Sequence, residues 1–243
     1  CEQLFGEALA EAAIDRASIQ FVTKCGIKLI SRRRPNHRTK SYDTSAAHIT
    51  ASVENSLRSL RTDYIDLLLI HRPDPLMDPA EVNEAFVALK EAGKVRHFGV
   101  SNFLPSQFDL LAARLDVPLV TNQIEYSVMC LEAHADGTVD QCQRLDVRPM
   151  AWSPLGGGRL FHEESEQTER LRETLGRIGH QVGGASIDQV ALAWVLMHPA
   201  RFLPVLGTGN ASRIRKAVEA LEMTLSREQW FEIWIASTGR DVP

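Results

Sequence analysis

Ile19-Gln-Phe-Val-Thr-Lys24 and Tyr64-Ile-Asp-Leu-Leu-Leu-Ile-His71 are two short, strand-like apolar runs that each end in an ionisable side chain. The pattern returns further along the chain, at residues 97–102, 119–123, 148–153 and 202–208. Buried strands that alternate with helices are typical of a parallel sheet. In a closed barrel of such units the carboxyl ends of all strands open onto one face, where the chemistry takes place. We therefore expect an α/β fold of the (β/α)8 TIM-barrel class, with lysine, histidine, hydroxyl and amide groups around one mouth.

The composition is that of an ordinary globular protein. The 243 residues are 44% hydrophobic and 24% charged, with a formal net charge of -4. This charge gives no broad basic field, so we expect neither nucleic acid nor a membrane as a partner. The four cysteines are widely spaced, which favours free thiols in a cytoplasmic protein over a zinc site or a disulfide framework. No metal site is expected, and residues 1–243 are expected to form a single domain.

Helices are predicted between the strands from apolar spacing and from capping residues. The clearest segments cover residues 44–60 and 79–91, and two more helices are expected near the end, at residues 211–221 and 226–236. Asp78-Pro79 is typical of an N-cap followed by the first helical residue, and Gly93 of a helix stop. Ser186-Ile-Asp-Gln189 predicts a capping box.

Residues 32–40, Arg32-Arg-Arg-Pro-Asn-His-Arg-Thr-Lys40, form the most concentrated charge run, with five Lys or Arg side chains. Such a run is usually a solvated loop. Alternatively, because it follows the strand that carries Lys24, it overhangs the barrel mouth and helps to admit an anionic ligand.

The sequence provides six strand segments, whereas a closed barrel of this class needs eight. The opening residues, 1–9, already have a helical pattern. We therefore expect the first two strands, roughly 40 to 60 residues, to lie N-terminal to Cys1.

A lysine at a barrel strand end is compatible with a Schiff-base aldolase, a phosphate-binding isomerase or a hydride-transfer enzyme. The neighbouring motifs appear in one order: Leu67-Leu-Leu-Ile-His71-Arg-Pro73, Gly93-Lys-Val-Arg-His-Phe-Gly-Val-Ser-Asn-Phe103, Asn122-Gln123 and Ala151-Trp-Ser-Pro-Leu-Gly156. Together they resemble the aldo-keto reductase superfamily over essentially the whole chain, especially its short-loop bacterial members. The resemblance implies an oxidoreductase that transfers a hydride from NADPH to an aldehyde or ketone carbonyl.

Two catalytic residues follow from the resemblance. Lys24 matches the lysine that lowers the pKa of the family's acid tyrosine, and His71 matches the histidine that orients the carbonyl. The competing interpretations are a solvent-facing lysine and a structural histidine. The acid tyrosine and its supporting aspartate are expected upstream of Cys1, so none of Tyr42, Tyr64 and Tyr126 is assigned that role.

The resemblance also implies a set of cofactor-binding residues. Those for the nicotinamide are Ser101, Asn102, Gln123 and, by stacking, Trp152. Those for the phosphates and the adenosine are Ser153, Pro154, Leu155, Gly156, Gly157, Arg159, Gly207, Thr208 and Gly209. Without the resemblance these would be turn residues and a core tryptophan, because neither glycine cluster is a Rossmann fingerprint.

Arg213 matches the family's arginine that binds the 2'-phosphate, which favours NADP as the cofactor. Three positions depart from the family pattern. Gly207 replaces the usual lysine before the hydroxyl residue, and Lys216 and Ala217 replace a common Glu-Asn pair.

Two rival functions remain open from the sequence. One is a nucleotide-binding regulatory subunit with little or no turnover, and the other is a lysine-based aldolase. Borohydride trapping of substrate on Lys24 would indicate the aldolase. We expect a small-molecule carbonyl substrate, and a monomer or a weak homo-oligomer.

Overall fold

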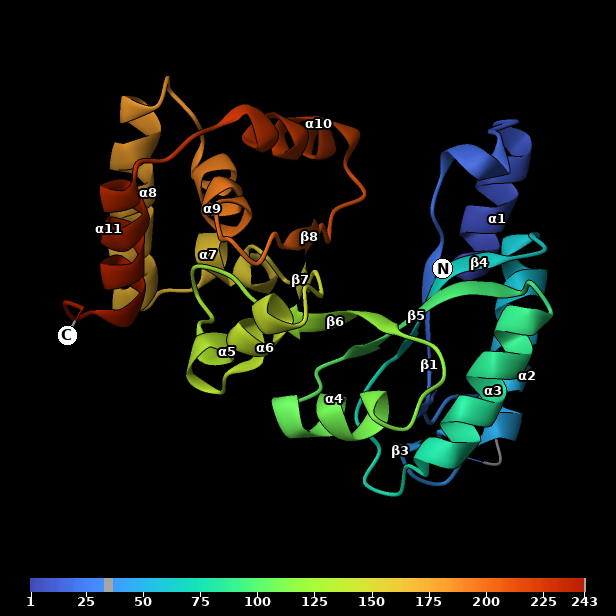
Figure 1. The fold of residues 1–243 in the computed structure, drawn as a ribbon. Coiled ribbons are helices and arrows are strands. Elements are labelled where there is room, and N and C mark those ends of the chain that lie inside the picture. The colour runs from blue at the N-terminus through green and yellow to red at the C-terminus, as the bar shows by residue number, and fades with distance from the viewer. Residues whose placement is uncertain (33–36, 243) are drawn as a thin grey trace. The chain divides into compact units, whose positions relative to one another are not determined.

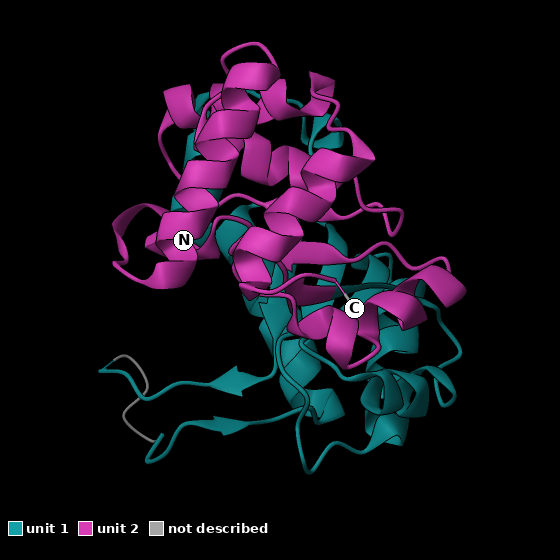
Figure 2. Ribbon diagram, turned by 90° about the vertical axis from the view of Figure 1, so that its left-hand side faces the viewer, with its two compact units in different colours: residues 1–122 teal, residues 123–243 magenta. Residues whose placement is uncertain are grey.

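The structure is a computed structural model that describes residues 1–32 and 37–242. These residues fall into two compact units, 1–122 and 123–243 (Figure 2). Strand β6 (Leu119–Glu125) crosses the boundary, so each unit contains part of it. The prediction of a single domain over residues 1–243 stays a prediction.

The first unit alternates strands with helices (Figure 1). Its further elements in chain order are α1 (Glu2–Glu11), the 3-10 turn η1 (Arg16–Ser18), β1 (Val22–Cys25), β2 (Ile27–Lys28), β3 (Ser41–Tyr42), α2 (Ala46–Leu60), β4 (Ile65–Ile70), α3 (Pro79–Glu91), β5 (Val95–Ser101) and α4 (Pro105–Ala112). The strand order is β1-β4-β5-β6, with β4 parallel to both β1 and β5. This is the parallel sheet that the alternating pattern predicts.

One face of this sheet is packed against helices. Leu68, Ile70, Phe98 and Val100 alternate with the residues of the other face and are all buried. Phe98 stacks on Phe86 of α3, with ring centroids 4.0 Å apart. Because side chains alternate along a strand, the intervening residues project from the opposite face.

The second unit has short strands and a larger number of helices (Figure 1). Its elements after β6 are α5 (Glu132–Ala135), α6 (Thr138–Arg144), β7 (Met150–Trp152), η2 (Gly156–Gly158), α7 (Arg159–His162), α8 (Glu166–Gln181), α9 (Ile187–Leu196), β8 (Leu203–Val205), α10 (Ala211–Glu219), η3 (Ala220–Glu222) and α11 (Arg227–Thr238). Strand β7 is parallel to both β6 and β8.

The core of the second unit is rich in aromatic side chains. Tyr126 stacks between Phe202 and Trp194, at centroid distances of 4.0 and 5.4 Å. Trp194 also stacks on Trp230, and each indole N–H donates to the backbone carbonyl of the other tryptophan. These paired bonds satisfy the polar atoms of two largely apolar rings and fix α9 against α11.

Helix boundaries agree with the capping signals in the sequence. Asp78 accepts a hydrogen bond from the backbone N–H of Ala80 before α3, and Gly93 follows that helix with φ +69°. Before α9, Gln189 accepts hydrogen bonds from both the backbone N–H and the hydroxyl of Ser186. The six predicted strands and the four predicted helices are thereby confirmed, with shifts of a few residues at their ends.

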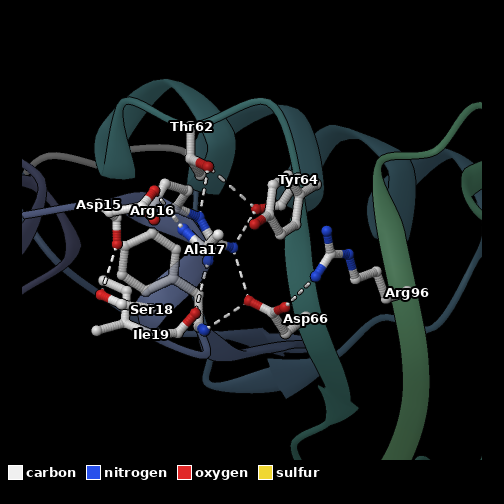
Figure 3. A network of polar contacts seen from close by, with 10 residues as sticks. Asp15, Arg16, Ala17, Ser18, Ile19, Thr62, Tyr64, Asp66 and Arg96 are labelled. Carbon is white, nitrogen blue, oxygen red and sulfur yellow. Dashed lines mark hydrogen bonds and ion pairs between the residues drawn. The ribbon is translucent and has the colours of Figure 1, made fainter.

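A charged network lies at the amino-terminal end of β4 (Figure 3). Asp66 accepts from Arg16 at 2.6 Å, from Arg96 at 3.1 Å and from the backbone N–H of Phe21 at 2.9 Å. The guanidinium carbons of Arg16 and Arg96 lie 3.9 and 3.8 Å from the centroid of the Tyr64 ring. This network ties η1 and the entry to β1 onto β4 and β5.

The antiparallel β2–β3 hairpin was not predicted. Its strands contain two residues each and flank the basic run, so they carry no periodic signal of their own. Residues 33–36 of that run lie outside the described residues, and nothing is concluded about their structure. Along the described ranges, no helix combines the length and the apolar character that crossing a membrane would need.

Candidate functional site

In the first unit, the strand register places Lys24, His71 and Ser101 on one face of the sheet. Lys24 pairs with Leu69, and Leu69 pairs with Gly99. His71 and Ser101 lie two residues beyond these partners, so their side chains project from the same face. The backbone N–H of His71 donates to the carbonyl of Cys25 at 2.9 Å, which continues the ladder to this point. All three residues stand at or just after the carboxyl ends of their strands.

The environment of Lys24 and His71 is partly buried and strongly positive. Burial, then the charges of Lys24, Arg72 and Lys40, lower the pKa of His71 to about 4. Burial and the nearby Arg72 also lower the pKa of Lys24. His71 is therefore neutral near pH 7, with one ring nitrogen able to donate and the other to accept. Lys40, the last residue of the basic run, is thus among the cations whose charge acts on His71.

Ser101 ends β5, and Asn102 follows it directly. The side-chain amide of Asn102 donates to the Ser101 hydroxyl at 2.8 Å. Asn102 has φ +59°, a left-handed conformation that asparagine tolerates better than most residues. The buried Asn122 bonds both backbone polar groups of Phe103, donating at 2.7 Å to its carbonyl and accepting at 3.4 Å from its N–H. Side-chain hydrogen bonds from Asn102 and Asn122 thus support the end of β5 and the residues that follow it.

In the second unit, Gln123 and Trp152 lie on one face of the strands. Gln123 pairs with Met150, and Glu125 pairs with Trp152, so alternation places all four on the same side. The side-chain amide of Gln123 lies 3.7 Å from the Met150 sulfur. An amide and a flat indole surface are therefore available on this face.

The loop after β7 requires glycine. Gly156, Gly157 and Gly158 have φ values of +62°, +64° and +91°, a left-handed run that side chains with a Cβ rarely adopt. A Cβ on Gly156 would lie 2.6 Å from the sulfur of Met129. Ser153, just before this run, also has a positive φ of +49°. A left-handed residue other than glycine, such as Ser153, carries backbone strain, and such residues are often found where a loop contacts a ligand.

A cavity of about 620 Å³ lies between this loop, the loop after β8, and helices α9 and α10. Seven of the predicted cofactor-binding residues line it: Ser153, Pro154, Leu155, Gly157, Gly207, Thr208 and Arg213. At the start of α10, the Asn210 side chain accepts hydrogen bonds from the backbone N–H groups of Ser212 and Arg213. The structure therefore gathers two loops and one cationic helix around a single space.

The remaining predicted residues of the second unit lie outside the lining of this cavity. They are Gln123, Trp152, Gly156, Arg159 and Gly209. The Nε of Arg159 donates to the carbonyl of Gly156 at 3.1 Å, and its guanidinium forms ion pairs at 3.8 Å with Glu125 and Glu163. Arg159 thus supports the glycine run through the backbone of Gly156.

Comparison with known proteins places these features in a family. The aldo/keto reductase family profile matches residues 1–237. The chain belongs to this family. It is 53% identical over 243 residues to the uncharacterized oxidoreductase YcsN of Bacillus subtilis, covering 100% of this chain and 81% of that protein. It is 47% identical over 241 residues to a 6-dehydroglucose reductase of Agrobacterium fabrum, covering 99% of this chain and 80% of that protein.

A solved structure confirms the fold class. A thermostable aldo-keto reductase, crystallised with the inhibitor epalrestat, matches with a TM-score of 0.82 at 28% identity, over 97% of this chain and 77% of that chain. The prediction of an α/β fold of the (β/α)8 barrel class is therefore correct. Membership of the aldo/keto reductase family, together with relatives named as oxidoreductases, supports oxidoreductase chemistry for this chain.

Sequence reasoning missed several side chains that line the cavity. Phe161 and His162 come from α7, Asp188 from the first turn of α9, and Lys216 from α10. The spacing of three residues between Arg213 and Lys216 could have indicated a shared helix face. Phe161, His162 and Asp188 have no sequence pattern that would place them at the cavity, because the short helix α7 and the position of α9 depend on tertiary packing.

Proposed function

We propose that this aldo/keto reductase chain transfers a hydride from NADPH to the carbonyl carbon of an aldehyde or ketone. The observation that carries the proposal is the common face of Lys24 and His71, at the carboxyl ends of adjacent parallel strands, with Ser101 on the next strand. An imidazole, an ammonium and a hydroxyl gathered in this way suit a polarised carbonyl group.

His71 is proposed to orient the substrate. Because burial and three nearby cations lower its pKa to about 4, the ring is neutral at physiological pH. A neutral imidazole can donate a hydrogen bond to a carbonyl oxygen without giving up its proton. Lys24 is proposed to stabilise the phenolate form of an acid tyrosine, since a nearby cation lowers the pKa of a phenol.

None of the three tyrosines of this chain is proposed as that acid. Tyr126 is fully buried and bonded to His134, and burial raises the pKa of its hydroxyl. Tyr64 precedes β4 at its amino-terminal end, away from the strand end that carries His71. Tyr42 lies on the short strand β3.

The residues of the cavity fit a dinucleotide. When bound, a nicotinamide cofactor supplies the hydride. The open, left-handed backbone at Gly157 and Gly158 suits close approach of phosphate groups, because a Cβ there would meet no atom closer than 3.6 Å. Outside the cavity lining, Ser101 and Asn102 of the first unit are proposed as carboxamide contacts. In the second unit, Gln123 is proposed as a further carboxamide contact and Trp152 as the surface on which the ring stacks.

Arg213 is proposed to bind the 2'-phosphate, which makes NADP the preferred cofactor. Arg213→Ala should weaken NADPH binding by about 1.5 to 3 kcal/mol while turnover at saturation stays nearly unchanged. Equal NADPH affinities of the wild type and the variant, measured by fluorescence titration, would remove the reason for preferring NADP.

The relatives suggest which carbonyl compounds to test. The Agrobacterium protein is a 6-dehydroglucose reductase, so we include aldehydes of hexoses in the proposed substrate class alongside small aliphatic and aromatic aldehydes. The decisive assay follows NADPH oxidation by the purified protein across this panel. Nucleotide binding without turnover on any member would instead favour a regulatory subunit.

A further inference from the structure

Two cations of helix α10 line the same cavity. Arg213 and Lys216 are three residues apart, so they are neighbours on one face of the helix. Within residues 1–32 and 37–242, neither side chain forms an ion pair. Both are exposed side chains on the cavity wall, and their charges are therefore available to a ligand.

Lys216 reverses a charge relative to the family pattern. A glutamate carboxylate would repel a phosphate group at this position. A lysine attracts a dianion and offers three donors instead. Lysine at this position therefore suits a doubly charged phosphate group better than glutamate would.

A phosphate group bound at the start of α10 would depend mainly on side-chain cations. The Asn210 side chain already accepts from the backbone N–H groups of Ser212 and Arg213, so these donors are occupied by the cap. A phosphate at this end of the helix must be held mainly by side chains. Among the described residues that line the cavity, Asp188 is the only acid, and the two cations outweigh it.

We propose that Lys216 is a specificity-determining residue that binds the 2'-phosphate together with Arg213 and so selects NADP over NAD. This inference rests on the proposed function, because it assumes that the cavity of the second unit binds the adenosine end of the cofactor. It goes beyond the proposed function by assigning the selection of NADP over NAD to Lys216, a position at which this chain departs from the family pattern.

The test compares nucleotide affinities of variants, measured by the quenching of tryptophan fluorescence, so that it needs no turnover. Lys216→Ala should weaken NADPH binding about 5- to 10-fold, as expected for one charged hydrogen bond at an exposed site, and NADH binding less than about 2-fold. Lys216→Glu should weaken NADPH binding by about 30-fold or more, because it adds repulsion to the lost attraction.

Arg215→Ala is the matched control. It removes one positive charge from the same helix, one position away, but Arg215 does not line the cavity. This variant should change both affinities less than about 2-fold. The NADPH affinity of the wild type should also fall more steeply with added salt than that of Lys216→Ala, because salt screens exposed charges.

Three outcomes would overturn the inference, and they separate it from the proposed function. If Lys216→Ala and Arg215→Ala have the same ratio of NADPH to NADH affinity, Lys216 does not select the cofactor. A selective NADPH loss in Arg213→Ala would then leave the proposed function standing. If the wild type binds both nucleotides equally, the inference is wrong, and if it binds neither, the proposed function is wrong as well.

Discussion

Replacing Asp66 tests the charged network at the amino-terminal end of β4 (Figure 3). This carboxylate has a side chain only 11% exposed and receives hydrogen bonds from Arg16, Arg96 and the backbone N–H of Phe21. Asp66→Ala removes the acceptor for all three donors. The first unit should lose stability, because the entry to β1 is attached to β4 through this side chain.

The size of the loss can be estimated contact by contact. The Arg16 bond is short and shielded, with the Arg16 side chain 22% exposed, so it contributes about 1.5 to 3 kcal/mol. Arg96 is 53% exposed, and its pair with Asp66 contributes only about 0.2 to 1 kcal/mol. Losing the acceptor of the buried Phe21 N–H costs about 1 kcal/mol or more. We expect Asp66→Ala to lower the free energy of unfolding by about 3 to 5 kcal/mol.

Urea denaturation at pH 7, followed by circular dichroism, measures this loss. Asp66→Asn should lose less, about 2 to 3 kcal/mol, because the amide oxygen can still accept one hydrogen bond. Glu7→Ala is the control: its ion pair with Arg61 spans 3.6 Å between exposed side chains and should contribute less than about 0.5 kcal/mol. A loss below about 1 kcal/mol in Asp66→Ala would refute the assigned role of the network.

Because Asp66 is titratable, we expect the free energy of unfolding to depend on pH. Burial alone would raise the pKa of Asp66, but the Phe21 and Arg16 bonds and the charges of Arg16 and Arg96 outweigh it and lower that pKa. A lowered folded-state pKa gives stability that is present above the unfolded value of about 3.9 and is lost as the pH falls through the folded value. Asp66→Asn should therefore flatten the acid limb of the stability profile, and an unchanged limb would contradict this.

Three further predictions concern the site in the first unit. Lys24→Met should lower turnover by about 100-fold or more with little change in NADPH affinity, and retained turnover would exclude the proposed role. In a proton NMR titration His71 should titrate near pH 4, and Arg72→Ala should raise that pKa; titration near 6.5 in the wild type would contradict the structure. Gly99→Ala should lower the free energy of unfolding of the first unit by about 1 to 3 kcal/mol, because the new Cβ would lie 2.8 Å from the Thr121 carbonyl oxygen. If urea denaturation gives the variant the same stability as the wild type, β5 and Thr121 can move apart to admit the methyl group.

The strands, and the positions of Lys24 and His71 near strand ends, could be predicted because local sequence determines them. An apolar run that ends in Lys24 or His71 predicts a strand, and it also predicts that the ionisable side chain lies at the carboxyl end of that strand. The register could not be predicted, since pairing of Lys24 with Leu69 and of Leu69 with Gly99 depends on how separate segments meet. That register is what places the ammonium, the imidazole and the Ser101 hydroxyl on one face.

The second-unit site was less predictable because its geometry depends on loops and helix packing. Gly156 could be recognised as part of a turn, but its close approach to Met129 could not. Asp188 and Lys216 line the cavity only because α9 and α10 are packed beside the loop after β8. The motifs therefore identified the loops and Arg213, whereas the places of Asp188 and Lys216 on the cavity wall follow from helix packing and could not be predicted.

The two sets of site residues depend on different physical constraints, and this has a consequence for how the chain can vary. Lys24, His71 and Ser101 are fixed by strand alternation, so a shift of one residue in register would turn each of them toward the helices. Arg213 and Lys216 stand on an exposed helix face, where a substitution changes charge but leaves the packing intact. If the proposed roles are correct, we expect cofactor preference to change by single substitutions on α10, whereas substitutions on the sheet face of Lys24, His71 and Ser101 should be tolerated poorly.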